Sequence, residues 1–163
     1  GCRRLAVVSS AARTTSLIER IEAFRARAAA SRAKVRIWQE RATTDYQTGR
    51  EAALALVMKE RIDGVFCVTD LLALGFLDAA RFECGRRVPE DLSVIGFDDV
   101  PQAAWSAYHL TTFRQPVDDL ASAVLRAIRR REAGVPTRSH LETVPIDLVV
   151  RSTVRKLSRE QAA

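Results

Sequence analysis

The chain has 163 residues, of which 47% are hydrophobic and 28% charged, and its formal net charge is +6 at pH 7. This length and hydrophobic content suit one globular domain with a sizeable core and exclude a disordered or low-complexity chain. No apolar run reaches the roughly 18 residues that a membrane-spanning helix needs, and no signal-peptide pattern opens the chain. We therefore expect a cytoplasmic protein that does not contact a membrane.

The positive charge alone does not indicate a nucleic-acid-binding surface. Only three of the 26 basic residues are lysines, and the arginines are spread along every segment. No recognition-helix or basic-arm motif is present, so we expect no DNA contact from these residues themselves. The three cysteines have no metal-ligand spacing, which predicts reduced thiols, no metal site and no cofactor.

Strand and helix patterns alternate four times in the first hundred residues. Short runs of β-branched and other apolar residues predict strands at 4–9, 35–39, 65–68 and 93–97. Apolar residues at helical spacing predict helices at about 17–32, 45–61 and 70–84. This alternation indicates an α/β fold, a parallel sheet with helices on both faces.

Beyond Asp99 the alternation loosens. Residues 111–114 predict a short strand, Pro116 the start of a helix and Gly134 its end, and 144–151 predict a last strand. The helix between Pro116 and Gly134 carries a strong apolar stripe, formed by Val117, Leu120, Ala121, Val124, Leu125 and Ile128.

Polar residues follow the predicted strands at the edge where parallel sheets bind ligands. They are Ser9, Ser10, Thr69, Asp98 and Asp99. Arg20, in the first predicted helix, can lean over the same edge. A carboxylate with neighbouring hydroxyls, faced by an arginine, suits a sugar or another polyhydroxy or heterocyclic ligand.

Structural interpretations of the same residues stay open at this point. Asp98 and Asp99 are equally consistent with acids in a turn, and Arg20 with a solvated helix residue. We interpret Asp70 as the N-cap of the helix that begins there.

No pattern indicates an enzyme. His109 and His140 are isolated, and residues 9–15 lack the glycines of a phosphate-binding loop. Asp70 with Asp98 and Asp99 faintly resembles an acidic phosphoacceptor pocket, but no lysine follows a late strand as such a pocket requires. We expect no catalytic residues.

Several stretches resemble, in the same order, the effector-binding domain of the lactose-repressor/galactose-repressor family of bacterial transcription regulators. They are CRRLAVVSS (2–10), VTDLLALG (68–75), CGRRVPEDLSVIGFDD (84–99), LTTFRQP (110–116) and PIDLVVRST (145–153). The resemblance implies part of a periplasmic-binding-protein-like fold of type I. It implies a C-terminal lobe at 1–109, a strand–helix segment of a missing N-terminal lobe at 110–134, and a return strand with a tail at 135–163.

The resemblance also implies which residues bind the ligand, namely Arg20, Thr69, Asp98 and Gln115, with Val117 lining the cleft from the hinge side. The family's arginine-x-x-glycine-phenylalanine motif matches Arg20, Ala23 and Phe24, so alanine replaces the glycine. Thr69 replaces a frequent asparagine and removes an amide donor. A stacking aromatic residue of the family falls near 44–46, and the choice between Thr44 and Tyr46 stays open.

The helix predicted at 70–84 has two apolar stripes. Ala73, Leu77, Ala80 and Cys84 suit contact with the sheet, and Leu71, Leu74 and Phe82 form a second stripe. A surface helix needs one apolar face, so the second stripe indicates either a partner or burial on both sides. The resemblance implies a dimer interface at Leu71, Leu74 and Phe82, together with residues 100–108.

The implied function is effector sensing and dimerisation in a transcription regulator. A small polar effector, sugar-like or nucleobase-like, would close two lobes, and DNA would be contacted only through a headpiece absent from this chain. We expect a homodimer, with exchange of residues 110–134 between copies as one way to cover the late apolar stripe. A solute-binding protein of a sugar transport system is the alternative, and an enzyme of flavodoxin-like architecture comes third.

Overall fold

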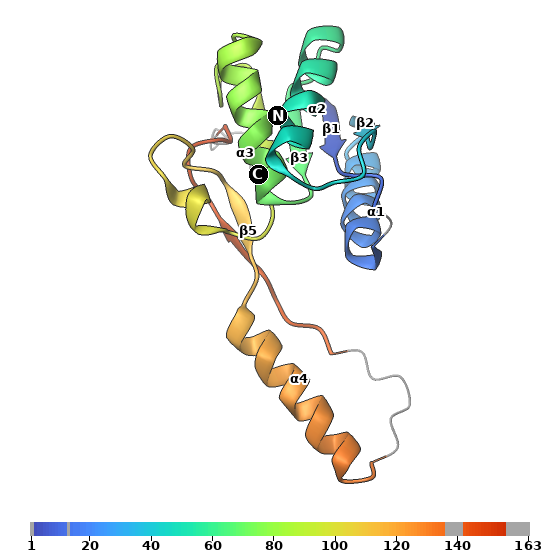
Figure 1. Ribbon diagram of the computed structural model, residues 1–163. Helices are drawn as coiled ribbons and strands as arrows, with labels where there is room; N and C mark the ends of the chain where they lie inside the picture. Colours follow the sequence, from blue (N-terminus) through green and yellow to red (C-terminus); the bar gives the residue numbers. More distant parts are fainter. Residues whose placement is uncertain (1, 13, 136–141, 156–163) are drawn as a thin grey trace, which may run out of the picture.

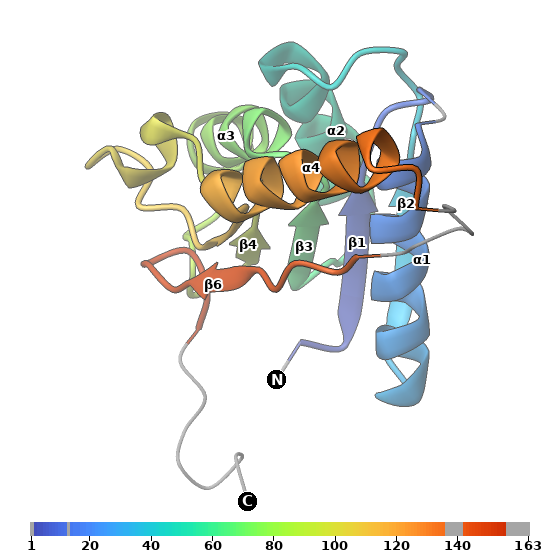
Figure 2. The same cartoon turned by 90° about the horizontal axis from the view of Figure 1, so that it is seen from below.

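The first part of the chain forms a four-stranded parallel sheet. The computed structural model describes residues 2–12, 14–135 and 142–155 (Figure 1). Its elements, in chain order, are β1 (Arg4–Val8), α1 (Thr15–Ala30), β2 (Lys34–Trp38), α2 (Tyr46–Lys59), β3 (Gly64–Cys67), α3 (Asp70–Asp78), the π-helical turn η1 (Ala79–Glu83) and β4 (Ser93–Ile95). The strand order is β2-β1-β3-β4 (Figure 2). The predicted α/β fold with a parallel sheet is confirmed.

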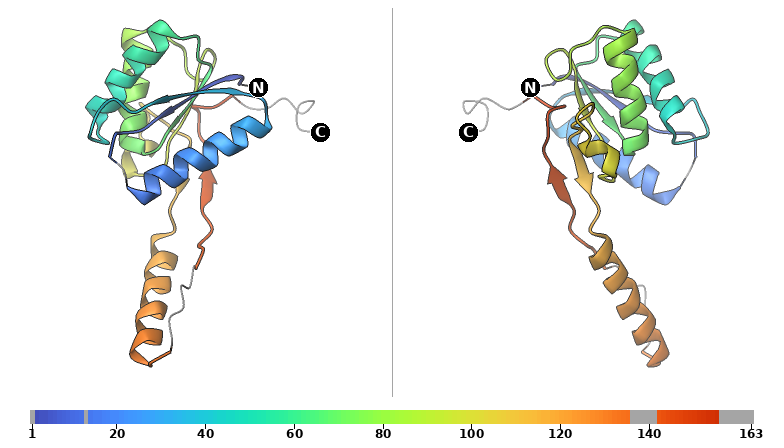
Figure 3. Two further views of the ribbon diagram at one scale, coloured as in Figure 1. Left: turned by 90° about the vertical axis from the view of Figure 1, so that its right-hand side faces the viewer. Right: turned by 60° about the vertical axis from the view of Figure 1, so that its left-hand side comes forward.

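Helices cover both faces of this sheet, with α1 on one side and α2 and α3 on the other (Figure 3). On the α1 side, Leu17 and Ile21 are buried and the ring of Phe24 stacks on Phe66 of β3, with 5.2 Å between ring centroids. The sheet core is apolar, because the last three residues of β1 and of β3 are at most 5% exposed. Burial on both faces explains why these strands read as continuous apolar runs.

Two glycines allow α2 and α3 to touch along their backbones. A Cβ atom added to Gly49 would lie 2.0 Å from the carbonyl oxygen of Leu72, and one added to Gly75 would lie 1.9 Å from that of Tyr46. Any side chain at either position would push the two helices apart. This close contact fixes α3, whose first turn lies at the carboxyl edge of the sheet.

The rest of the chain leaves the sheet and returns. It comprises the 3-10 turn η2 (Pro101–Ala104), β5 (Thr112–Arg114), α4 (Val117–Glu132) and β6 (Asp147–Val149). Single parallel bridges connect Ile95 with Thr111 and Asp98 with Arg114, while β5 and β6 pair antiparallel. Helix α4 stands away from the sheet (Figure 1), and none of its residues is buried. We call β5, α4 and β6 together the arm.

Most differences from the predicted elements concern their ends. Strand β4 ends at Ile95, two residues earlier than predicted, because the backbone turns at Asp98 and Asp99 with φ values of 130° and 58°. Strand β6 is shorter than the predicted 144–151. The helix after Pro116 ends at Glu132, and Gly134 follows it with φ 69°, as its role of terminator predicts. His140 lies outside the described residues.

The two predicted stripes of the third helix have different outcomes. Ala73, Leu77 and Ala80 are fully buried, as predicted. Leu71 and Phe82 are 46% and 81% exposed, while Leu74 is only 4% exposed, so the second stripe is partly buried within the chain.

A loop lies beside α3. Asp78, one helical turn beyond Leu74, accepts a hydrogen bond from the Tyr108 hydroxyl at 2.9 Å, and Arg81 Nη1 donates to the Ala107 carbonyl oxygen at 2.6 Å. These contacts hold residues 107 and 108 against α3 and η1. Among the described residues, no helix is both long and apolar enough to cross a membrane.

Candidate functional site

Three of the four predicted ligand-binding residues meet at the carboxyl edge of the sheet. Arg20 Nη1 lies 3.7 Å from Asp98 Oδ1, and Gln115 Nε2 donates to the same oxygen at 2.7 Å. They come from α1, the turn after β4 and the residues after β5. The side chains of Arg20 and Asp98 are 18% and 28% exposed, so the pair is sheltered but still reachable from solvent.

Arg20 is held by two further contacts. Its Nη1 donates to the carbonyl oxygen of Val68 at 2.7 Å, and its guanidinium carbon lies 3.7 Å from the ring centroid of Phe97. A cation over an aromatic face is attracted by the ring quadrupole. Burial lowers the pKa of Arg20, and the charge of Asp98 works against that shift. The guanidinium is therefore fixed in one orientation towards Asp98.

Asp98 can accept hydrogen bonds from a ligand. Burial raises the pKa of its carboxyl, while the charge of Arg20 and the hydrogen bond from Gln115 lower it. The carboxylate is flanked by two donors that can also reach a ligand oxygen. A hydroxyl group, which donates and accepts at once, matches this combination.

The backbone at Asp98 and Asp99 is strained. Both are non-glycine residues with positive φ, and the Asp98 amide donates to the carbonyl oxygen of Phe113 at 2.9 Å. Such conformations cost about 1–3 kcal/mol each and cluster at ligand sites, where the surrounding structure holds them. The strain supports a functional interpretation of this turn.

Asp99 has a different role from its neighbour, and sequence analysis left that role unassigned. It accepts from Arg114 Nε and from Arg151 Nη2, both at 2.7 Å, and its side chain is only 7% exposed. Burial alone would raise the pKa of Asp99, but hydrogen bonds from Arg151 and Arg114 outweigh it and lower the pKa. Asp99 thus ties β5 and the residues after β6 to the sheet edge.

Thr69, the fourth predicted ligand residue, caps α3. Its hydroxyl oxygen accepts from the Leu72 amide at 3.4 Å, and its side chain takes no part in the cluster of Arg20, Asp98 and Gln115. The predicted cap at Asp70 is therefore wrong by one residue.

Asp70 is instead a buried anchor. One carboxylate oxygen accepts from the Val100 amide at 3.0 Å and the other from the Thr112 hydroxyl at 2.5 Å. A Cβ atom added to Gly96 would lie 2.2 Å from that second oxygen, so only glycine fits there. Burial raises the pKa of Asp70, although the hydrogen bonds from Thr112 and Val100 oppose this. Asp70 therefore joins α3 to β5.

The remaining polar residues near the edge have structural contacts. Ser9 and Ser10 are fully buried, and the Ser10 hydroxyl oxygen accepts from the Ala12 amide at 3.3 Å. The Tyr46 hydroxyl donates to Asp78 at 2.7 Å, which raises the pKa of Tyr46 to about 12. Thr44 is exposed.

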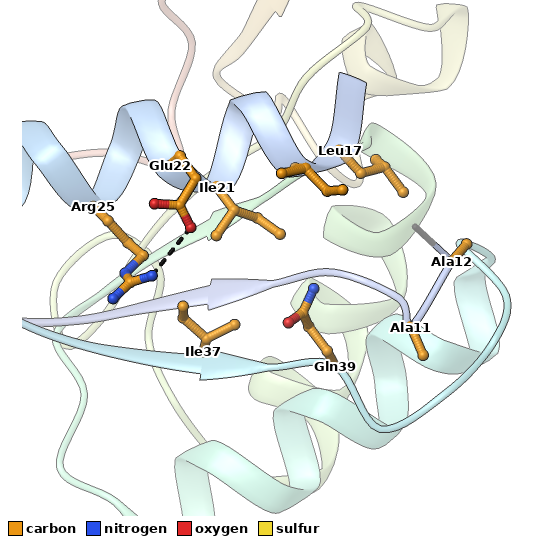
Figure 4. A pocket seen from close by; sticks show the side chains of 9 residues that line it. Ala11, Ala12, Leu17, Ile21, Glu22, Arg25, Ile37 and Gln39 are labelled. Atoms are coloured by element: carbon orange, nitrogen blue, oxygen red, sulfur yellow. Dashed lines mark hydrogen bonds and ion pairs between the residues drawn. The ribbon is translucent and has the colours of Figure 1, made fainter. Parts of the chain in front are cut away.

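A cavity of about 380 Å³ lies beside α1, at the ends of β1 and β2. It is lined by Ala11, Ala12, Leu17, Ile18, Ile21, Glu22, Arg25, Ile37 and Gln39. Figure 4 shows Ile21 and Ile37 opposite each other, and Arg25 paired with Glu22 at 3.0 Å. None of the four predicted ligand residues lines this cavity, so the cluster of Arg20, Asp98 and Gln115 lies outside it.

Comparisons with known proteins agree with this fold. A family model described as periplasmic binding protein-like domain matches residues 1–154. The HTH-type transcriptional regulator MalR of Streptomyces coelicolor is 39% identical over 114 residues, which cover 69% of this chain and 32% of that protein.

Two solved structures are also similar. A LacI-family regulator from Corynebacterium glutamicum has a TM-score of 0.79 and 29% identity, over 94% of this chain and 59% of its own. The transcriptional regulator CelR in complex with cellobiose has a TM-score of 0.80 and 27% identity, over 94% of this chain and 47% of its own.

The sheet, the flanking helices and these matches together define the class of domain. The chain belongs to the periplasmic binding protein-like domain family and corresponds, within it, to part of the effector-binding domain of LacI-family transcriptional regulators. This confirms the resemblance and the fold class predicted from sequence. The similar proteins are regulators and not enzymes. The matched part of the chain covers only 32% of the length of MalR.

Proposed function

We propose that this chain senses a small polar effector, most simply a sugar, for a LacI-type transcription regulator. The observation that carries the proposal is Asp98, whose carboxylate faces the guanidinium of Arg20 and the amide of Gln115. A sugar hydroxyl can donate to the carboxylate and accept from either donor. The cellobiose bound to CelR supports a sugar as the first effector to test.

The proposed ligand lies between two lobes. Residues 1–109 would form one lobe, 110–134 would contribute β5 and α4 to a second, and 135–163 would return to the first. The exposed apolar stripe of α4 supports this division, because Val117, Val124 and Ile128 are 70%, 58% and 48% exposed in the chain by itself. With one lobe nearly complete and the other represented by β5 and α4, we expect weak ligand binding by these residues alone.

The proposed signal passes from Asp98 to the arm. Asp98 would contact the effector, while its neighbour Asp99 holds Arg114 of β5 and Arg151 after β6. An effector shifts the equilibrium between two arrangements of the lobes only if it binds one arrangement better than the other. DNA binding would belong to a headpiece outside these residues, and the regulator would act in the cytoplasm.

We also infer a homodimer that uses the exposed face of α3 and η1. Leu71 and Phe82 remain on this surface, and Trp105 of the neighbouring loop is 56% exposed. Exchange of residues 110–134 between copies is a second way to cover an apolar face, that of α4.

The dimer is tested by light scattering of wild type and the double variant Leu71→Glu/Phe82→Glu. We expect the double variant to be a monomer. The matched control is Met58→Glu, because Met58 is 72% exposed but lies on α2, and it should remain a dimer. Dimers of all three proteins, or monomers of all three, would contradict the proposed interface.

The effector class is tested by thermal shift of the protein with cellobiose, glucose and adenine. We expect a sugar to raise the melting temperature of wild type, because a ligand that binds only the folded state stabilises it by mass action. Arg20→Lys should reduce this rise, since lysine lacks the planar fork of donors. A rise with adenine but with neither sugar would contradict the sugar assignment.

A further inference from the structure

The edge of the sheet opposite the candidate site carries a basic groove. Arg4 begins β1 and Lys34 begins β2, while Ile62 and Asp91 lie two residues before β3 and β4. Because all four strands are parallel, these positions share the amino edge.

Two adjoining cavities form this groove. One, of about 380 Å³, is lined by Arg4, Arg61, Ile62, Arg86 and Asp91. The other, of about 310 Å³, shares Arg4, Arg61 and Ile62 and adds Leu5, Lys34, Val35, Arg36 and Glu60. We call the two cavities together the amino-edge groove.

The acids that line or border the groove already have partners. Glu60 pairs with Arg36 at 3.1 Å, and Asp91 accepts two hydrogen bonds from the Arg87 guanidinium, at 2.6 and 2.9 Å. The carboxylate of Asp63 lies 3.8 Å from Nε of Arg4 and accepts a hydrogen bond from the backbone amide of Arg4 at 2.9 Å.

Two arginines of the groove form no ion pair within 4 Å among the described residues, and Asp91, which lies on the same cavity, is paired with Arg87. Within the described part of the chain, neither Arg61 nor Arg86 has a carboxylate within 4 Å, and both side chains are exposed. They line one cavity together with Arg4. Converging positive charges repel each other, and a bound anion would relieve this repulsion.

The planar shape of the guanidinium groups indicates which anion would bind. A guanidinium presents a planar fork of donors that matches two oxygens of a phosphate. The second cavity adds Leu5 and Val35, which with Ile62 are half-buried apolar residues. A phosphate beside a less polar organic group fits both halves of the groove.

We propose that the amino-edge groove binds a phosphorylated small molecule, with its phosphate between Arg61 and Arg86 and its organic part over Leu5, Val35 and Ile62. This site lies at the opposite edge from Arg20 and Asp98 and shares no residue with them. It does not depend on the proposed effector function.

The test is a titration followed by two-dimensional amide NMR, with AMP, adenosine and inorganic phosphate as probes. We expect AMP to shift the amides of Arg61, Ile62 and Arg86 saturably, inorganic phosphate to bind the same residues more weakly, and adenosine to leave them unchanged. Equal affinity for AMP and inorganic phosphate would contradict the proposed contact between the organic part of the ligand and the apolar residues of the groove. Equal affinity for AMP and adenosine would overturn the phosphate contact.

Matched variants separate a site from general attraction to a basic protein. Arg61→Gln/Arg86→Gln should weaken AMP binding about tenfold, because charge-assisted hydrogen bonds are lost. Arg129→Gln/Arg130→Gln on α4 makes the same change in net charge and should bind AMP like wild type. All four arginines are exposed, so the fold should persist, which melting curves verify. Equal loss in both double variants would overturn the proposal.

Discussion

The four-stranded sheet with α1, α2 and α3, which we call the lobe, and the arm use amphipathic helices in opposite ways. In the lobe, α1, α2 and α3 each place their apolar residues against the sheet or against one another. In the arm, α4 has a clear apolar stripe, yet Leu120, Val124 and Leu125 are all at least 40% exposed. An amphipathic pattern thus predicts that a face will be covered, but not whether the covering surface belongs to the same chain.

The largest expected effect is a difference in stability between these two regions. Leu72 of α3 is fully buried, so Leu72→Ala should lower the free energy of unfolding by about 2–5 kcal/mol. Leu120→Ala in the arm should change it by less than about 0.5 kcal/mol in the monomer. Urea denaturation at low protein concentration measures both. A similar loss in both variants would mean that α4 is packed against its own chain.

The anchor between lobe and arm should come next. Asp99→Asn removes two charge-assisted hydrogen bonds and should cost about 1–3 kcal/mol at pH 7. The folded-state pKa of Asp99 is lowered, so its contribution to stability is present above the unfolded-state pKa and is lost as pH falls through the folded-state pKa. The difference in stability between wild type and Asp99→Asn should therefore shrink in acid. A difference that is constant with pH would contradict this account.

Asp70 should show the opposite pH dependence. Burial raises its folded-state pKa, so its protonated form suits the folded protein, and stability falls as pH rises through the range between the unfolded-state and folded-state values. Asp70→Asn keeps the shape of the side chain but cannot ionise. Its stability relative to wild type should therefore improve as pH rises across this range, as unfolding curves at several pH values would reveal. A relative stability that worsens with rising pH would refute the assignment.

The smallest expected effect is at the end of α3. Tyr46→Phe removes one of two hydroxyl donors to Asp78, and Tyr108 still donates there. The side chain of Tyr46 is 40% exposed, so we expect a loss of only about 0.5 kcal/mol. In a pH titration of tyrosine absorbance, wild type should show a tyrosine with a pKa of about 12 that the variant lacks. An unchanged titration would mean that Tyr46 does not contact Asp78.

The sequence predicted the sheet well because its strands are buried on both faces and read as apolar runs. It failed where a residue's environment comes from distant segments. Asp70 was interpreted as a local cap, but its partners Val100 and Thr112 lie 30 and 42 positions further along the chain. Leu74 shares a stripe with Leu71 and Phe82, and no local pattern indicates that Leu74 is the buried member of the three.

The same contrast applies to the paired aspartates. Two adjacent acids at a strand end look equivalent in sequence, and the family resemblance distinguished only Asp98. The role of Asp99 depends on Arg114 in β5 and on Arg151 after β6, which both donate to it. Conversely, Arg20 and Asp98 lie together as expected. In a parallel sheet the carboxyl ends of the strands and the starts of the following helices share one edge, and both residues belong to that edge.

The central claim is that the edge formed by Arg20, Asp98 and Gln115 binds a sugar-like effector. The most direct test is calorimetric titration of a sugar that stabilises wild type into wild type, Asp98→Asn and Asp118→Asn. Asp118 is exposed in the first turn of α4 and serves as the matched loss of one negative charge. We predict that Asp98→Asn weakens binding about tenfold or more and that Asp118→Asn binds like wild type. Unchanged affinity in Asp98→Asn would contradict the account.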